Sequence, residues 1–248
     1  MLIIGNWKAY VENREEAKKI YGAAKRIAAR TRGIKLVLAP PAPFLGLLAA
    51  GKRTKIAFAG QDISASVTGS ATGEVVGSAL FSAGASYVII GHSERRARGE
   101  SDTLIAEKVK RAVVHRLIPV LCIGEKERDE DARYLLEIRR QLDAVYTKLS
   151  SRERLEIVIA YEPVWAIGQR SQDAMHAEDL IEMMLYIRKV LGEYVPGKAS
   201  QKTTILYGGS VDAENVRTLA KGSRVDGFLV GRASAEPETF SALVRALA

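Results

Sequence analysis

The chain repeats one unit eight times: a short apolar run typical of a β-strand, followed by a segment with helical spacing. The runs are Leu2–Trp7, Lys35–Ala39, Ile56–Gly60, Tyr87–His92, Ile118–Ile123, Ile157–Glu162, Thr203–Tyr207 and Gly227–Val230. Strands that alternate with helices predict a parallel sheet covered by helices. The runs are almost continuously apolar, as in strands that are buried on both faces. Eight units in 248 residues therefore favour an α/β fold, a closed (β/α)8 barrel with outer helices, over an open doubly wound sheet.

The segments between the runs indicate where the core should lie. Two stripes of apolar residues recur at helical spacing: Leu135, Ile138, Leu142, Val145 and Leu149, and then Leu180, Met184, Ile187 and Leu191. We interpret both stripes as core contacts with the strands. Ser101-Asp102 predicts the start of a helix over Thr103–His115. No linker or low-complexity stretch divides the chain, so we expect one domain over residues 1–248.

Composition limits the class of protein. The chain is 47% apolar and 27% charged, which is typical of a globular protein, and no run reaches the roughly 18 uncharged residues of a membrane helix. The charge of Lys8 comes too early for a secretory signal, so we expect a cytoplasmic protein without a membrane partner. The single cysteine, Cys122, excludes an internal disulfide and a cysteine-built metal site. Its apolar surroundings in the sequence predict a buried, inert thiol.

The net charge of +8 is compatible with nucleic-acid binding. The basic residues are nevertheless spread among acids along the helical segments, and no basic block or aromatic-interleaved stripe is present in the sequence. We therefore favour solvated helix faces and predict no nucleic-acid partner. A positive field would also suit a small anionic substrate. Retention of nucleic acid at low salt would support the alternative.

Polar residues stand where several runs end. Asn6 and Lys8 close the first run. His92 closes the fourth, where strand alternation places it on the face of Val88, and Glu162 closes the sixth. In a parallel barrel the active site forms at these strand ends. Each residue alone has an ordinary explanation, such as a structural hydrogen bond, a solvated lysine or a rim salt bridge. Their coincidence at one face favours a site in which the carboxylate is a general base.

Glycine loops follow the last two runs. Gly208-Gly209-Ser210 follows the seventh and Gly231-Arg232 the eighth. A glycine pair is often only a turn, but glycine also lets backbone N–H groups approach a phosphate closely, and this fold usually binds phosphate at these two loops. The combination suits proton abstraction beside a carbonyl in a small phosphorylated compound. His92, His115 and His176 lie far apart in the sequence and lack the spacing of a ligand set, so we predict no metal site.

Six motifs follow one another along the chain: Gly5–Lys8, Thr72–Glu74, Gly91–Arg96, Ala160–Gly168, Tyr207–Ser210 and Asp226–Gly231. In this order they resemble the motifs of the triosephosphate isomerase family over nearly the full chain. The resemblance implies a TIM barrel and an isomerase that interconverts dihydroxyacetone phosphate and glyceraldehyde 3-phosphate through an enediolate, as in glycolysis and gluconeogenesis. It also implies that the reaction needs no metal and no cofactor.

The same resemblance implies a role for each polar residue. Glu162 removes a proton from the carbon beside the carbonyl and returns it to the neighbouring carbon. His92 acts as a neutral imidazole that polarises the carbonyl and moves protons between the two oxygens. Lys8 supplies positive charge to the developing oxyanion and the phosphate, and Asn6 adds a hydrogen bond. Glu94 matches a carboxylate that pairs with the lysine, although an ordinary helix-start acid is the alternative.

The resemblance also implies a phosphate site and a lid. Backbone N–H groups around Gly168, Ser210, Gly231 and Arg232 would hold the phosphate. Pro163–Gln172 would close over the substrate and expel water.

A homodimer is implied by the loop Thr68–Glu74. In the family this loop enters a pocket of a second subunit, where the threonine that Thr72 matches supports the active-site asparagine. Gly73 and Glu74 complete the matching motif. From the residues alone, a polar surface loop is the alternative.

The chain departs from the family pattern in three places. Arg170 replaces a lid glycine, which should restrict backbone freedom. Arg232 replaces the second glycine of a phosphate loop. Its side chain could face solvent, pair with Glu236 or Glu238, or contact the phosphate, and we favour solvent or an ion pair. Ala9-Tyr10 replaces a longer apolar residue and an asparagine beside the dimer loop.

A second class of function remains open because two glycines are replaced. The chain could be a binding or scaffold protein that kept the fold and lost turnover. The intact Asn6, Lys8, His92 and Glu162 argue against this alternative.

Overall fold

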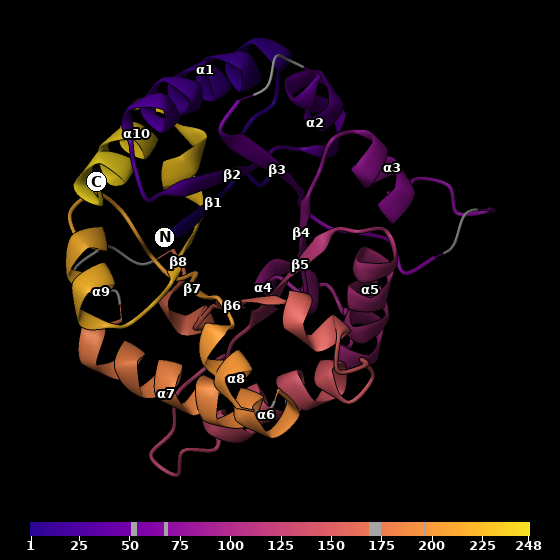
Figure 1. Ribbon diagram of the computed structural model, residues 1–248, viewed down its shortest axis with the longest axis vertical. Helices are drawn as coiled ribbons and strands as arrows, with labels where there is room; N and C mark the ends of the chain where they lie inside the picture. The colour runs from indigo at the N-terminus through magenta and orange to yellow at the C-terminus, as the bar shows by residue number, and fades with distance from the viewer. Residues whose placement is uncertain (51–53, 67–68, 169–174, 196) are drawn as a thin grey trace.

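The computed structural model describes residues 1–50, 54–66, 69–168, 175–195 and 197–248. It confirms the predicted closed barrel of eight parallel strands, in which each strand pairs with the next along the chain and the last pairs with the first. The strands are β1 (Leu2–Asn6), β2 (Lys35–Ala39), β3 (Ile56–Gly60), β4 (Tyr87–Ile90), β5 (Ile118–Ile123), β6 (Val158–Tyr161), β7 (Ile205–Tyr207) and β8 (Gly227–Val230). Figure 1 shows the helices as a ring around these strands.

The described helices lie between the strands and after β8. They are α1 (Arg14–Arg30), α2 (Ala42–Ala49), α3 (Gly77–Ser82), α4 (Ser93–Ala97), α5 (Asp102–Val114), α6 (Tyr134–Tyr146), α7 (Ala177–Tyr194), α8 (Lys198–Lys202), α9 (Val216–Gly222) and α10 (Pro237–Ala246). Helix α5 begins where the sequence predicts, because the Ser101 hydroxyl oxygen caps it by accepting from the N–H of Leu104 at 3.2 Å. No helix within the described ranges is long and apolar enough to cross a membrane.

The barrel has two apolar layers. The outer layer packs the helices on the strands and contains both predicted stripes, although Leu135 is only partly buried. The inner layer fills the barrel and includes Ile4, Ile89 and Cys122. Cys122 is fully buried, and burial raises the pKa of its thiol well above the ordinary value. The prediction that the thiol is buried is therefore confirmed.

Strands β1, β4 and β6 end earlier than predicted, and the early end of β4 changes the geometry of the site. Strand β4 stops at Ile90, so His92 belongs to the following loop. The prediction that His92 shares the face of Val88 is wrong, since Val88 packs in the outer layer while His92 lines a cavity at the barrel mouth. Between them, Gly91 has a φ of 72°, a conformation that suits glycine and interrupts the strand alternation.

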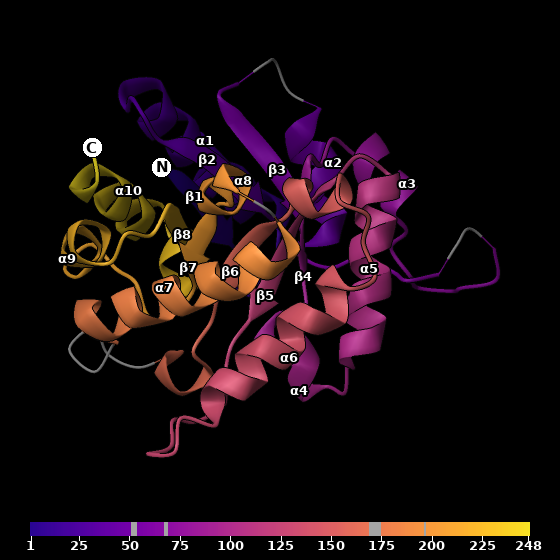
Figure 2. The same ribbon diagram turned by 60° about the horizontal axis from the view of Figure 1, so that its bottom comes forward.

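One segment stands apart from the barrel. Described residues between β3 and α3 project beyond the ring of helices in both ribbon views (Figures 1 and 2). Its described part includes Thr72, Gly73 and Glu74, which are exposed. Thr68, which the predicted dimer loop also includes, lies outside the described residues.

Candidate active site

A cavity of about 420 Å³ lies at the carboxyl ends of the strands. Eight of the predicted site residues line it: Asn6, Lys8, His92, Glu162, Gly168, Ser210, Gly231 and Arg232. They come from the loops after β1, β4, β6, β7 and β8, except Asn6, which ends β1. Because the strands are parallel, segments far apart in the sequence meet at this one rim.

Glu162 and His92 lie side by side in the cavity. Glu162 Oε1 is 3.3 Å from His92 Nε2, and Glu162 Oε2 accepts a hydrogen bond of 3.1 Å from the N–H of Ser93. Both residues are buried, with 2% and 6% of their surfaces exposed. A buried carboxylate with few hydrogen bonds is costly to keep unless it acts on a ligand.

Local hydrogen bonding gives His92 a defined tautomer. His92 caps α4, and its Nδ1 accepts from the N–H of Glu94 at 3.2 Å. An accepting Nδ1 carries a lone pair, so the proton of the neutral ring is on Nε2. His92 therefore presents an N–H to the cavity.

Lys8 brings the positive charge to the site. Its Nζ lies 2.7 Å from Glu94 Oε1, with 16% of the lysine side chain and 56% of the glutamate side chain exposed. Glu94 lies outside the cavity lining and reaches the site through this contact. Partial burial would raise the pKa of Glu94, but the hydrogen bond and charge of Lys8 lower it overall. The carboxyl group of Glu94 therefore stays ionised at neutral pH.

The backbone of Lys8 is unusual. Its φ is 46°, a region that residues other than glycine rarely occupy. The N–H of Lys8 donates to Asn6 Oδ1 at 3.0 Å, and Gln61 Nε2 donates to the carbonyl of Lys8 at 2.9 Å. These bonds hold the strained turn that directs the ammonium into the cavity.

The part of the cavity that is formed by the loops after β7 and β8 is rich in glycine. A Cβ at Gly208 would lie 2.8 Å from Glu162 Cγ, so the absent side chain makes room for the carboxylate. A Cβ at Gly231 would lie 3.6 Å from Lys8 Cε. Arg232 is exposed, in line with the solvent-facing alternative for its side chain.

The predicted lid is described only in part. Val164–Ala166 forms a 3-10 turn, and Gly168 has a φ of 76°. The departure at Arg170, with the rest of Gln169–Gln172, lies outside the described residues.

Sequence reasoning missed Glu125, which is fully buried next to the site. Its Oε1 accepts from the Tyr161 hydroxyl at 2.8 Å and from Trp165 Nε1 at 2.9 Å. Its carbonyl accepts from the N–H of Val164 at 2.9 Å. Glu125 thus fastens the segment on both sides of Glu162. The signal was present, because Glu125 follows the fifth apolar run as closely as His92 follows β4.

Known proteins are similar to this chain over nearly its whole length. A family model described as "Triosephosphate isomerase" matches residues 1–247. The chain is 38% identical to a protein of that name from Symbiobacterium thermophilum, over 100% of this chain and 96% of the relative. It is 38% identical to one from Thermus thermophilus, over 99% and 98%, and 36% identical to one from Moorella thermoacetica, over 98% and 97%.

Proposed function

This chain belongs to the triosephosphate isomerase family, and on that premise we propose that Glu162, His92 and Lys8 carry out the reaction of the family in the cavity of the barrel. The reaction interconverts dihydroxyacetone phosphate and glyceraldehyde 3-phosphate by proton transfer through an enediolate. The binding or scaffold alternative has no support in these relationships.

The proton transfers follow from the positions of the two buried side chains. Glu162 takes a proton from the carbon beside the carbonyl, and the electron pair of that C–H bond moves toward the carbonyl oxygen. His92 donates its Nε2 proton to this oxygen and takes a proton from the neighbouring oxygen. Glu162 then returns its proton to the second carbon, and the sum is an isomerisation with no net gain or loss. Glu162 Oε2 accepts a hydrogen bond from the N–H of Ser93, and the carboxylate has to move away from that N–H to reach the substrate carbon.

Other residues of the cavity stabilise the developing negative charge and bind the phosphate. The ammonium of Lys8 offsets the negative charge that develops on the enediolate oxygen. Asn6 contributes a hydrogen bond near the same oxygens. The backbone around Gly168, Ser210, Gly231 and Arg232 binds the phosphate, because glycine-rich loops expose N–H groups to an anion.

The close approach of Glu162 to His92 in one cavity with Lys8 is the observation that carries this proposal. A coupled assay of triose phosphate isomerisation, run with and without a chelator, tests it. We expect equal turnover in both conditions, because the proposed steps use side chains alone. Glu162→Ala should lower kcat by about 10² to 10⁴-fold with a small change in KM. Turnover near that of the wild type in Glu162→Ala would reject the base assignment.

We also propose the oligomeric state and the cellular location of this protein. The projecting segment with Thr72, Gly73 and Glu74 supports a homodimer, since an exposed loop of this kind is suited to insertion into a second copy. Phe81 of the adjacent α3 is 48% exposed and adds apolar surface. We place this enzyme in the cytoplasm, as a single domain over residues 1–248. Sedimentation equilibrium tests the dimer, and a monomer at micromolar concentration would contradict it.

A further inference from the structure

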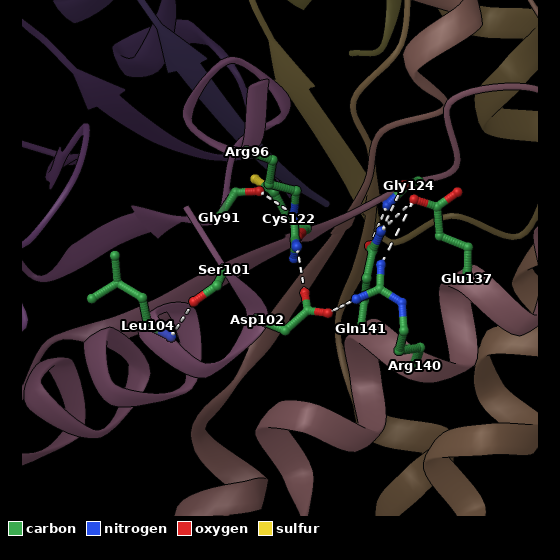
Figure 3. Close-up of polar contacts among 10 residues, drawn as sticks. All are labelled: Gly91, Arg96, Ser101, Asp102, Leu104, Cys122, Gly124, Glu137, Arg140 and Gln141. Atoms are coloured by element: carbon green, nitrogen blue, oxygen red, sulfur yellow. Dashed lines mark hydrogen bonds and ion pairs between the residues drawn. The ribbon is translucent and has the colours of Figure 1, made fainter. Parts of the chain in front are cut away.

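A polar side chain lies deep between helix α6 and the barrel. Gln141 is 2% exposed, and its carboxamide forms two hydrogen bonds with one residue. The N–H of Gly124 donates to Gln141 Oε1 at 2.9 Å, and Gln141 Nε2 donates to the carbonyl of Gly124 at 2.9 Å (Figure 3). One side chain therefore fixes both the backbone N–H and the backbone carbonyl of Gly124. Gln141 does not line the cavity.

Gly124 packs directly on the backbone of the proposed base. A Cβ at Gly124 would collide with the carbonyl oxygen of Glu162, so no side chain separates the two backbones. The neighbouring N–H of Glu162 donates to the carbonyl of Ile123 at 2.7 Å. Any displacement of Gly124 is therefore transmitted to the backbone that carries Glu162.

A second, partly buried side chain holds the backbone beside His92. Arg96 Nε donates to the carbonyl of Gly91, the residue before His92, at 2.8 Å. Arg96 Nη2 donates to the carbonyl of Cys122 at 3.1 Å (Figure 3). Arg96 therefore ties the end of β4 to the end of β5.

A series of polar contacts connects Arg96 to Gln141. Arg96 Nη1 lies 2.6 Å from Asp102 Oδ1, and the second oxygen of Asp102 contacts Arg140. Arg140 Nη2 lies 3.9 Å from Glu137 Oε1, the same oxygen that accepts from Gln141 Nε2 at 3.4 Å. The contacts run without a break from Gly91 to Gly124, as Figure 3 shows for the labelled residues.

We propose that Gln141 is a positioning residue for the isomerisation: by clamping Gly124 it sets the distance between Glu162 and His92. The inference rests on the proposed catalytic roles of those two residues. An apolar side chain of similar volume would fill the same space between α6 and β5, so packing alone does not require an amide. The amide is required because it bonds to both backbone groups of Gly124, and a glycine has no side chain that could fix its position by packing. A shift of about 1 Å in a reacting group can lower turnover by about 10²-fold.

Two substitutions separate positioning from stability. Gln141→Met keeps the volume and removes both hydrogen bonds, and we expect kcat to fall about 10-fold or more with KM changed less than about twofold. Gln141→Glu keeps the acceptor for the Gly124 N–H but, when ionised, has no donor for the Gly124 carbonyl. Protonation restores that donor. The ratio of kcat in Gln141→Glu to kcat in the wild type should therefore rise as the pH falls toward the pKa of the introduced carboxyl.

The matched control is Arg139→Met on the same helix. Arg139 faces outward and pairs with Glu193 between α6 and α7, away from Gly124. This variant should keep the kcat of the wild type whatever it does to the melting temperature. Circular dichroism before and after each assay shows that the compared proteins are folded.

The outcomes divide cleanly. A folded Gln141→Met with the kcat of the wild type, or with raised KM and unchanged kcat, overturns the positioning role. If Gln141→Met does not fold, a flat kcat ratio against pH in Gln141→Glu overturns it. Glu162→Gln is measured in parallel: if it keeps full turnover, the proposed function fails as well, whereas an inactive Glu162→Gln beside a fully active Gln141→Met rejects this inference alone.

Discussion

The two walls of the cavity are built in different ways. On the wall formed by the ends of β4 and β6, His92 and Glu162 are almost fully buried and hydrogen-bonded to backbone N–H groups. On the wall formed by the ends of β1, β7 and β8, Lys8 is partly exposed, Arg232 is exposed, and glycines replace side chains.

We infer from this difference that the first wall serves proton transfer and the second wall serves phosphate binding. Proton transfer needs two groups at a fixed distance in a site from which water is excluded, and buried side chains with backbone partners meet that need. A phosphate needs positive charge and N–H groups, which work at a partly open surface. Substitutions on the first wall should therefore lower kcat, and substitutions on the second should raise KM.

His92→Gln should have the largest effect among the variants below. Glutamine can donate a hydrogen bond but cannot exchange its proton, so kcat should fall by about 10² to 10⁴-fold with KM nearly unchanged. Steady-state kinetics in both directions measures it. His176→Gln is the matched control, because His176 is exposed at the start of α7 and should keep full turnover. A pure KM effect in His92→Gln would remove the distinction between the walls.

Lys8→Met tests the second wall. The variant removes a charge-assisted contact to an anionic substrate, so KM should rise by about 10 to 10²-fold. We expect kcat to fall as well, because the same ammonium offsets the charge that develops on the enediolate. The contact with Glu94 is lost in the same variant, and Glu94→Gln shows how much of the effect belongs to that pair. A fall in kcat with unchanged KM would instead move Lys8 to the chemical wall.

Gly208→Ala asks whether the walls interact. The new methyl group would press on Glu162 Cγ, so we expect kcat to fall by about 10-fold with a smaller change in KM. Gly192→Ala is the control, since a Cβ at Gly192 on α7 has no atom within 4 Å. Equal kinetics in both variants would show that Glu162 tolerates the methyl group.

Arg232→Gly should have the smallest effect. An exposed guanidinium contributes little to binding, and KM should change by less than about threefold. A rise of 10-fold or more, measured at low salt, would show that the side chain reaches the phosphate.

The fold and the cavity could be predicted from the sequence because both rest on local patterns. Buried parallel strands are continuous apolar runs, and the topology brings the ends of all such runs to one rim. Asn6, Lys8, His92 and Glu162 could therefore be grouped by their positions at the ends of these runs, and all four line the cavity. The cavity residues of the glycine loops followed from the same rule.

Other features had no local signal. The direction of His92 depends on the positive φ of Gly91, which strand periodicity does not contain. In the sequence Gln141 is one polar residue on an amphipathic helix. Its contact with Gly124 exists only because α6 packs against β5. Glu125 had the right position in the sequence, but its donors, Tyr161 and Trp165, meet it only in three dimensions.

The closure of the barrel has a consequence for the order of assembly. Leu2 of β1 pairs with Gly227 of β8, so this pairing can form only after β8 has been synthesised. Until then one edge of β1 is open to pairing with other chains. The joint itself depends on a missing side chain, because a Cβ at Gly227 would collide with the backbone of Leu2. A side chain at position 227 would therefore push apart the two strands whose pairing closes the barrel.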